Sequence, residues 1–236
     1  MRSIHISLIS LILLAACGQP NASGKSPQKQ DSTPISDSLT SKAPEDTSHY
    51  TFAHADDYED RMPINLPPSL ANLVPKGYSV LDTASGDLNL DSLPDMILIL
   101  HRTDEAASNS DLTTSQRPLL ILTGQPDHSL KLATQNNNAV LCRQCGGQMG
   151  DPYQRTVIKK GYFSLEFYGG AAERWEEIIT FKYAPTDSTW YLHKFSKTTF
   201  DAADEKARHN TDIISEKDFG KISFNEFNAS ESLHND

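Results

Sequence analysis

The chain lacks clusters of basic residues. Its 21 lysines and arginines are outnumbered by 31 aspartates and glutamates, so the formal net charge at pH 7 is −10 and the isoelectric point is about 5.2. Proteins that bind nucleic acids or anionic lipid surfaces do so through patches of Lys and Arg. This charge balance therefore excludes DNA, RNA and other polyanions as expected partners.

Long apolar runs are scarce, and the longest lies at the N-terminus. Apolar residues dominate from Ile4 to Leu14, after a single positive charge at Arg2. The stretch is too short to cross a bilayer as a retained helix. Small residues follow it, and this order is typical of an export signal. We therefore predict a signal peptide over residues 1–16.

The end of this signal resembles the bacterial lipobox, in the residues Leu14-Ala15-Ala16-Cys17. The resemblance implies cleavage before Cys17, which then carries a diacylglycerol thioether and an N-acyl group such as palmitate. Several acyl chains together anchor a protein stably to a membrane. Gly18 stands where an aspartate would favour the inner membrane, and no acidic cluster follows. We therefore expect an outer-membrane lipoprotein that faces the periplasm.

The remaining chain divides by composition. Residues 17–49 are rich in Ser, Pro, Thr, Gln, Lys and Asp and have few apolar residues, so we expect a disordered tether behind the lipidated cysteine. Residues 50–77 form a lead-in, with a short helix after Pro68 that turns Leu70, Leu73 and Val74 towards the core. A single β domain is predicted over residues 78–227, followed by a disordered tail over 228–236.

Cysteine is rare, with only Cys142 and Cys145 besides Cys17. In an oxidising compartment, thiols separated by two residues usually pair, so we expect a disulfide. A redox dithiol is an alternative, although the glycine-rich residues 146–152 do not resemble the helix start of thioredoxin-like motifs. A zinc site is another, but it needs two further ligands, and the histidines at 101, 128 and 193 are scattered.

The most informative stretch is an Asp-rich loop before the apolar run 96–100. Its oxygen ligands would be the side chains of Asp87, Asn89, Asp91 and Asp95 and the carbonyl of Leu93. This spacing suits calcium, which takes several oxygen ligands in a tight loop. An EF-hand is excluded because Ser92 and Leu98 replace its glycine and glutamate, and a strand follows. The alternative is a solvated Asx turn between two strands.

The loop resembles the FG-GAP or VCBS repeat, whose pattern is Gly-Asp-x-Asn-x-Asp-Gly-x-x-Asp followed by an apolar strand. The resemblance covers one unit of about four strands, at 78–84, 96–100, 118–122 and 129–133. In that family the loop binds calcium, which implies this role for Asp87, Asn89, Asp91, Leu93 and Asp95. The chain also resembles exported bacterial proteins with one such repeat and a Cys-x-x-Cys-Gly-Gly loop, a resemblance that implies no activity.

Two hairpins are predicted after residue 152, with apolar residues at every second position. Their aromatic stripes are at 163–167, 175–183 and 190–195, and we expect them in the core. A loop over 169–173 would place Glu166 opposite Glu176 and Tyr168 opposite Arg174. Like charges in this position destabilise a sheet. The pair could be an acid/base couple or could be neutralised by Arg174. We expect His193 to be a hydrogen-bonded sheet residue.

These observations predict a mainly β fold, with one antiparallel sheet built from the FG-GAP-like unit and the two hairpins, and short helices at its edges. The favoured function is a non-enzymatic, calcium-binding envelope lipoprotein with a binding or structural role. Its expected partners are the membrane, through the anchor, and another envelope protein. One alternative is a periplasmic immunity or inhibitor lipoprotein. Another is an envelope hydrolase or thiol oxidoreductase.

Overall fold

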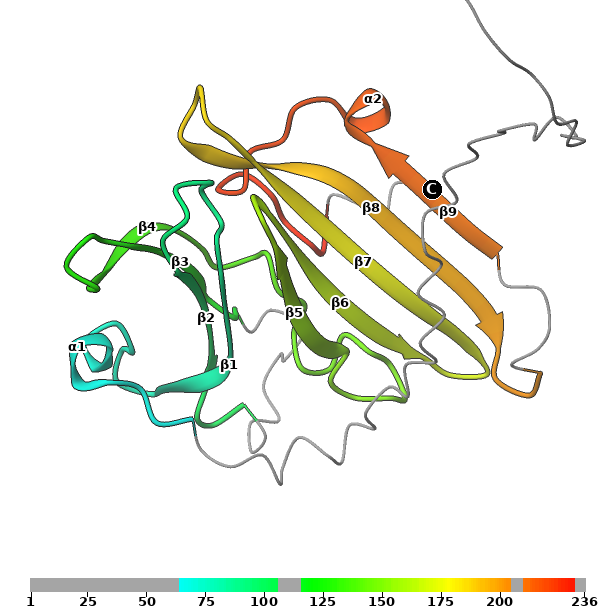
Figure 1. Cartoon of the computed structure of the whole chain (residues 1–236). Helices are drawn as coiled ribbons and strands as arrows, with labels where there is room; N and C mark the ends of the chain where they lie inside the picture. Colours follow the sequence, from blue (N-terminus) through cyan, green and yellow to red (C-terminus); the bar gives the residue numbers. More distant parts are fainter. Residues whose placement is uncertain (1–63, 106–115, 205–209, 232–236) are drawn as a thin grey trace, which may run out of the picture. The chain divides into compact units, whose positions relative to one another are not determined.

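Strands dominate the computed structural model, which describes residues 64–105, 116–204 and 210–231 (Figure 1). All of these residues belong to one unit, His49–Asp236. The predicted signal peptide, Cys17, the tether and the lead-in up to residue 63 lie outside the described residues. The mainly β prediction is confirmed. The strands form two antiparallel sheets, however, where one was predicted.

The first sheet is a four-stranded meander in the order β1-β2-β3-β4. Its elements are the short helix α1 (Pro68–Ala71), β1 (Tyr78–Gly86), β2 (Asp95–Arg102), β3 (Leu119–Gly124) and β4 (Leu130–Asn136). All four strands of the predicted repeat unit are therefore present. The Asp-rich loop connects β1 to β2.

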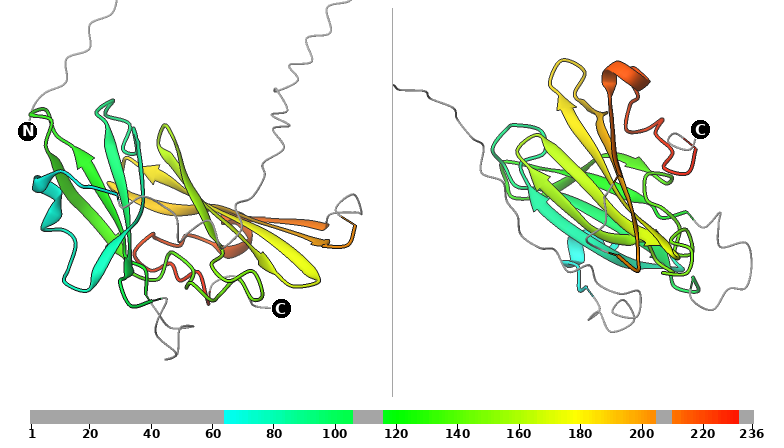
Figure 2. Two further views of the ribbon diagram at one scale, coloured as in Figure 1. Left: turned by 90° about the horizontal axis from the view of Figure 1, so that it is seen from below. Right: turned by 90° about the vertical axis from the view of Figure 1, so that its right-hand side faces the viewer.

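The second sheet contains five strands in the order β5-β6-β7-β8-β9. They are β5 (Tyr153–Lys159), β6 (Tyr162–Gly170), β7 (Glu173–Ala184), β8 (Thr189–Asp201) and β9 (Asn210–Ser215), and α2 (Glu216–Phe219) follows. Strand β9 was not among the predicted strands. Figure 2 shows that the ends of β7 and β8, together with β9, extend beyond the first sheet.

Both faces of the two central strands of the first sheet, β2 and β3, are buried. Ile97, Ile99 and Ile121 face the second sheet, whereas Leu98 and Leu120 pack against the helix residue Leu70. Residues alternate between the faces of a strand. Burial on both sides therefore explains why β2 and β3 are continuous apolar runs. As predicted, Leu70, Leu73 and Val74 pack against the sheet.

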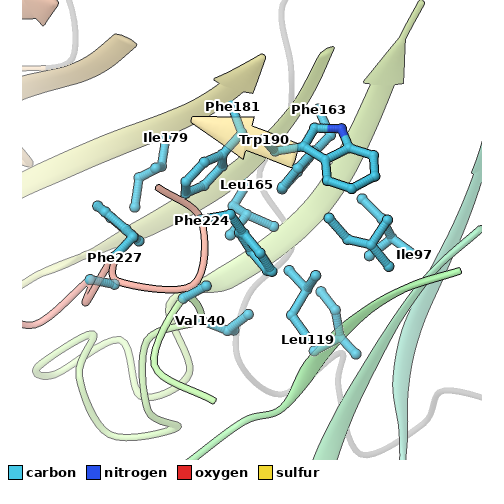
Figure 3. Close-up of a cluster of buried hydrophobic side chains, with 14 of the residues drawn as sticks. Ile97, Leu119, Val140, Phe163, Leu165, Ile179, Phe181, Trp190, Phe224 and Phe227 are labelled. Atoms are coloured by element: carbon cyan, nitrogen blue, oxygen red, sulfur yellow. The ribbon is translucent and has the colours of Figure 1, made fainter. Parts of the chain in front are cut away.

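The main core lies between the two sheets and is rich in aromatic residues (Figure 3). Phe163 stacks on Phe181 with 4.9 Å between ring centroids, and Phe224 lies edge-on to both. Most residues of the predicted aromatic stripes are therefore core residues, and Trp175 and Tyr183 pack against the core half-buried. Phe224 and Phe227 come from the C-terminal segment, which docks on the sheet as expected.

The ordered domain continues beyond the predicted boundary at residue 227. Ala229 is buried in the core, and its backbone N–H donates a hydrogen bond to the carbonyl of Asn138 over 2.9 Å. The prediction that residues 228–236 form a disordered tail is therefore wrong for 228–231. Residues 232–236 lie outside the described residues.

The predicted register between β6 and β7 is also wrong. Tyr168 lies opposite Glu176, and Glu166 lies opposite Ile178. The turn is shorter than predicted because Gly170, at φ +111°, lies within the ladder opposite Arg174. Glycine adopts such angles without a steric penalty. The two glutamates therefore do not face each other.

Candidate functional site

The Asp-rich loop is closed by its own side chains. The N–H of Asp91 donates to Oδ1 of Asn89 over 3.1 Å, and the N–H of Leu93 donates to Oδ1 of Asp91 over 2.7 Å. These contacts, two residues apart, are the Asx turns that Asp and Asn favour. Leu90 and Ser92 have positive φ angles of 66° and 69°. Ser92 occupies the glycine position of the FG-GAP pattern, where the chain needs this conformation.

Asp95 fastens the loop to the first sheet. Its side chain is buried, and Oδ2 accepts hydrogen bonds from the N–H groups of Leu88 (2.6 Å) and Asn89 (3.2 Å). Oδ1 accepts a third, from Gly124 at the end of β3, over 2.8 Å. Burial raises the pKa of Asp95, and the backbone hydrogen bonds oppose this shift. The carboxylate therefore links β2 to the Asp-rich loop and to the end of β3.

Asp87 differs from the other carboxylates of the loop. Its Oδ1 atom is buried without a hydrogen-bond partner. Burying a charged oxygen costs free energy unless an opposite charge or a donor compensates it. A cation among Asp87, Asn89, Asp91, the Leu93 carbonyl and Asp95 would supply that charge. Carboxylate oxygens that already accept an N–H keep a further lone pair, so the donor set fits calcium.

The loop is not a ready-made cluster of acidic ligands. Among the described residues, no three His, Cys, Asp or Glu side chains are gathered in a way that could hold a metal ion. Asp91 and Asp95 point to backbone N–H groups instead. A cation would therefore have to draw Asp91 towards Asp87, against the hydrogen bonds that now close the loop.

The same loop joins the two sheets. Leu88 is fully buried in the core between them, and its carbonyl accepts a hydrogen bond from the indole N–H of Trp190 over 3.1 Å. The carbonyl of Asp87 accepts the N–H of Gly161, at the β5–β6 turn, over 2.8 Å. No local sequence signal indicates these contacts, because Trp190 is 102 residues from Leu88.

The two cysteines lie at disulfide distance, with their Cα atoms 5.1 Å apart. Cys142 is buried, and Cys145 packs against the core. The glycines after them form tight turns, in which the N–H of Gly146 donates to the carbonyl of Gly150 over 3.0 Å. The pair therefore closes the loop that leads into β5.

A buried ionic cluster lies next to this loop, and the sequence analysis missed it. Arg117 is fully buried, and Glu105 accepts hydrogen bonds from its Nε (2.9 Å) and Nη2 (3.0 Å). Asp151 accepts from Nη1 (2.8 Å) and Nη2 (2.6 Å), and the carbonyl of Leu141 accepts from Nη1. All five N–H groups of the guanidinium are thus used. The cluster links the start of β3 to the segment before β5.

The charges in this cluster stabilise one another. Burial alone would raise the pKa of Glu105, but hydrogen bonds from His101 and Arg117 outweigh it and lower the pKa to about 2. Burial opposes the charge of Arg117, yet its two carboxylate partners raise its pKa. Asp151 lies 34 residues from Arg117, so no local spacing could reveal the pairing.

The other ionisable residues singled out in the sequence are structurally engaged. Glu166 forms an ion pair with Arg155, at 2.7 Å from Oε2 to Nε. The ring of His193 lies edge-on to Tyr162, with 5.4 Å between ring centroids. Burial and the neighbouring Lys182 lower the pKa of His193, which favours the neutral imidazole.

Comparison with protein families, with curated proteins and with solved structures finds no match to this chain. Within the part of the chain that the structure describes, no helix has the length and apolar character needed to pass through a membrane. A functional assignment consequently rests on the residues themselves.

Proposed function

We propose that this protein is a non-enzymatic lipoprotein of the bacterial envelope, with a binding or structural role, and that calcium in the Asp-rich loop braces its β domain. The observation that carries the calcium proposal is the buried, unpartnered Oδ1 of Asp87 within a loop of oxygen donors. The ligands would be Asp87, Asn89, Asp91, the Leu93 carbonyl and Asp95. The ion would neutralise the negative charge of these carboxylates.

The position of the loop supports a bracing role. Its backbone is hydrogen-bonded to Trp190 and Gly161 of the second sheet, and Asp95 binds it to β3 of the first. An ion that binds the folded loop but not the unfolded chain stabilises the fold by mass action. Calcium would therefore stabilise both sheets together.

The envelope location is supported by the sequence Leu14-Ala15-Ala16-Cys17, which lies outside the described residues. The paired cysteines agree with an oxidising compartment. A non-enzymatic role is supported by the engagement of Glu166 with Arg155 and by the saturation of the Arg117 guanidinium. The Arg117 guanidinium has no N–H group left for a substrate, and Glu166 is engaged in an ion pair within its own sheet.

Thermal unfolding with and without calcium tests the ion site. At a free calcium concentration 100-fold above Kd, binding stabilises the fold by about 2.7 kcal/mol, which raises Tm by roughly 5–10 °C for a domain of this size. The variant Asp87→Asn should lose most of this shift. Asp104→Asn is the matched control, because Asp104 is an exposed carboxylate paired with Arg102 outside the loop. An equal Tm in calcium and in chelator would refute the calcium site.

A further inference from the structure

The outer strand β9 differs from the other three sheet edges. Strands β1, β4 and β5 each contain a bulged residue, because the register shifts at Leu81, Ala133 and Gln154. Bulges and lysines on edge strands hinder pairing with another chain. Strand β9 pairs with β8 at six consecutive positions without a shift. Within the described residues it therefore has a regular edge without a bulge, and its one charged side chain is that of Asp212.

The side chains of β9 also favour pairing. Its six residues, Asn210 to Ser215, include no proline and no lysine. Ile213 is 60% exposed, more than any other large apolar side chain among the described residues. Ile178, Ser196 and Ile213 form one row across three strands, in which the small Ser196 lies between the two exposed isoleucines.

We propose that β9 pairs antiparallel with β9 of a second copy of this chain, with Ile213 directly opposite Ile213. The two second sheets would then join into one continuous sheet across a two-fold axis. Such an isologous contact uses the same surface on both copies. The pairing would bury the most exposed apolar side chain of the described residues against itself.

This register follows from the strand itself. A two-fold axis between two residues would place side chains from opposite faces in one pair, which the alternation of a strand forbids. An axis through Asp212 would set two carboxylates directly opposite each other, which is destabilising. An axis through Thr211 or Ile214 leaves a three-residue overlap. The axis through Ile213 pairs five positions, with Thr211 opposite Ser215 and Asp212 opposite Ile214.

The self-complementary register favours a second copy over a foreign strand. On the face of β9 that carries Ile213, the pairing places Ile213 opposite Ile213 and Thr211 opposite Ser215. No like charges lie opposite each other. Within the described residues, the neighbours of β9 are β8 and α2. Figure 1 shows β9 as the outermost strand of its sheet, and no other described strand pairs with its outer side.

Cysteine cross-linking of the full chain in bacterial membranes tests the pairing and its register. Directly paired residues have Cα atoms about 4.5–5.5 Å apart, which suits a disulfide. Under mild oxidation, Ile213→Cys should therefore give a product of twice the chain mass. Thr211→Cys and Ser215→Cys should cross-link when co-expressed, and neither should do so alone. Leu132→Cys, an exposed apolar position on the bulged edge strand β4, is the matched control.

A second test introduces a positive charge on β9 and measures the yield of the cross-link. Ile213→Lys should reduce the Thr211→Cys/Ser215→Cys cross-link at least tenfold and leave the Tm of dilute, unpaired protein unchanged, because Ile213 is exposed in the single chain. Absence of a doubled product from Ile213→Cys, or an equal yield from Leu132→Cys, would overturn the proposal. A product of any other mass from Ile213→Cys would show a foreign chain on this edge and would overturn it as well.

Discussion

Ser92 is a strained residue of the Asp-rich loop. It occupies a glycine position of the FG-GAP pattern and has a φ angle of +69°. A non-glycine residue in this region costs about 1–2 kcal/mol, because Cβ crowds the following carbonyl. Ser92 therefore adopts a conformation that glycine would adopt without this cost.

The first prediction concerns this strain. Ser92→Gly should raise the free energy of unfolding by about 0.5–1 kcal/mol, since relief of the strain exceeds the entropic cost of glycine. This corresponds to a Tm increase of about 2–3 °C, measured in chelator so that calcium plays no part. Ser92→Ala keeps a Cβ atom and should bring no gain. A glycine variant no more stable than the alanine variant would contradict the expectation.

The second prediction concerns pH. Folding lowers the pKa of Glu105 from its ordinary value of 4.5 to about 2. The resulting stabilisation is complete above pH 4.5 and is lost as the pH falls from 4.5 towards 2. Because Glu105 is almost fully buried, its contribution is about 3 kcal/mol.

Urea unfolding at pH 7 and pH 3 measures this contribution. The wild-type protein should lose more stability between the two pH values than Glu105→Gln, whose side chain does not titrate. Comparing the two chains cancels the titration of other carboxyls. Asp104→Asn removes an adjacent, exposed carboxylate and should keep nearly the wild-type pH dependence. An equal loss of unfolding free energy between pH 7 and pH 3 in wild type and Glu105→Gln would show that the cluster does not govern acid stability.

At the scale of elements, the loop between β1 and β2 is a structural joint as well as a candidate ion site. Leu88 is buried in the core. The carbonyl of Asp87 accepts a hydrogen bond from Gly161, and the carbonyl of Leu88 accepts one from Trp190. Gly161 is needed at this contact. Its φ is +77°, and a Cβ atom there would lie 2.7 Å from Cδ2 of Leu90. A side chain at this position would therefore be strained by the backbone angle and would displace the end of Leu90.

The third prediction tests this joint. Leu88→Ala should lower the free energy of unfolding by about 3–5 kcal/mol, because truncating a fully buried leucine leaves a cavity. Leu90→Ala is the control within the same loop, since Leu90 is 44% exposed and should cost less than about 1 kcal/mol. Denaturant midpoints of the three chains give the comparison. Equal losses from both variants would contradict the role of Leu88 as the buried residue of the joint.

At the scale of the whole molecule, the proposed anchor and the β domain are separated along the chain. The described residues start at 64, whereas the proposed lipidation sequence ends at Cys17. Lipidation is therefore testable without any change to the folded part.

The fourth prediction addresses the anchor. Cells grown with labelled palmitate should incorporate the label into the wild-type chain and not into Cys17→Ser. The wild-type protein should fractionate with outer membranes, because several acyl chains together hold a protein at a bilayer. The double variant Cys142→Ser/Cys145→Ser is the control and should still be labelled. Label in the Cys17→Ser chain would show that the lipid is attached at another residue and would contradict lipidation at Cys17.

Much of this protein follows from local patterns in its sequence. The alternation of Phe163, Leu165 and Phe167 predicted a half-buried strand, and the Asx turns of the loop follow from Asp and Asn at alternate positions. The continuous apolar run of β2 indicated a strand, although not that both of its faces are buried. Such features depend on neighbours a few residues away, so a sequence displays them directly.

Other features depend on residues that meet only after folding. The division into two sheets, the polar strand β9 and the β6–β7 register follow from contacts or turn angles that local periodicity does not encode. The pairing of Arg117 with Asp151, and of Leu88 with Trp190, joins positions 34 and 102 residues apart. Burial creates these partnerships, because a charge or an indole N–H removed from water must find a partner wherever the fold brings one.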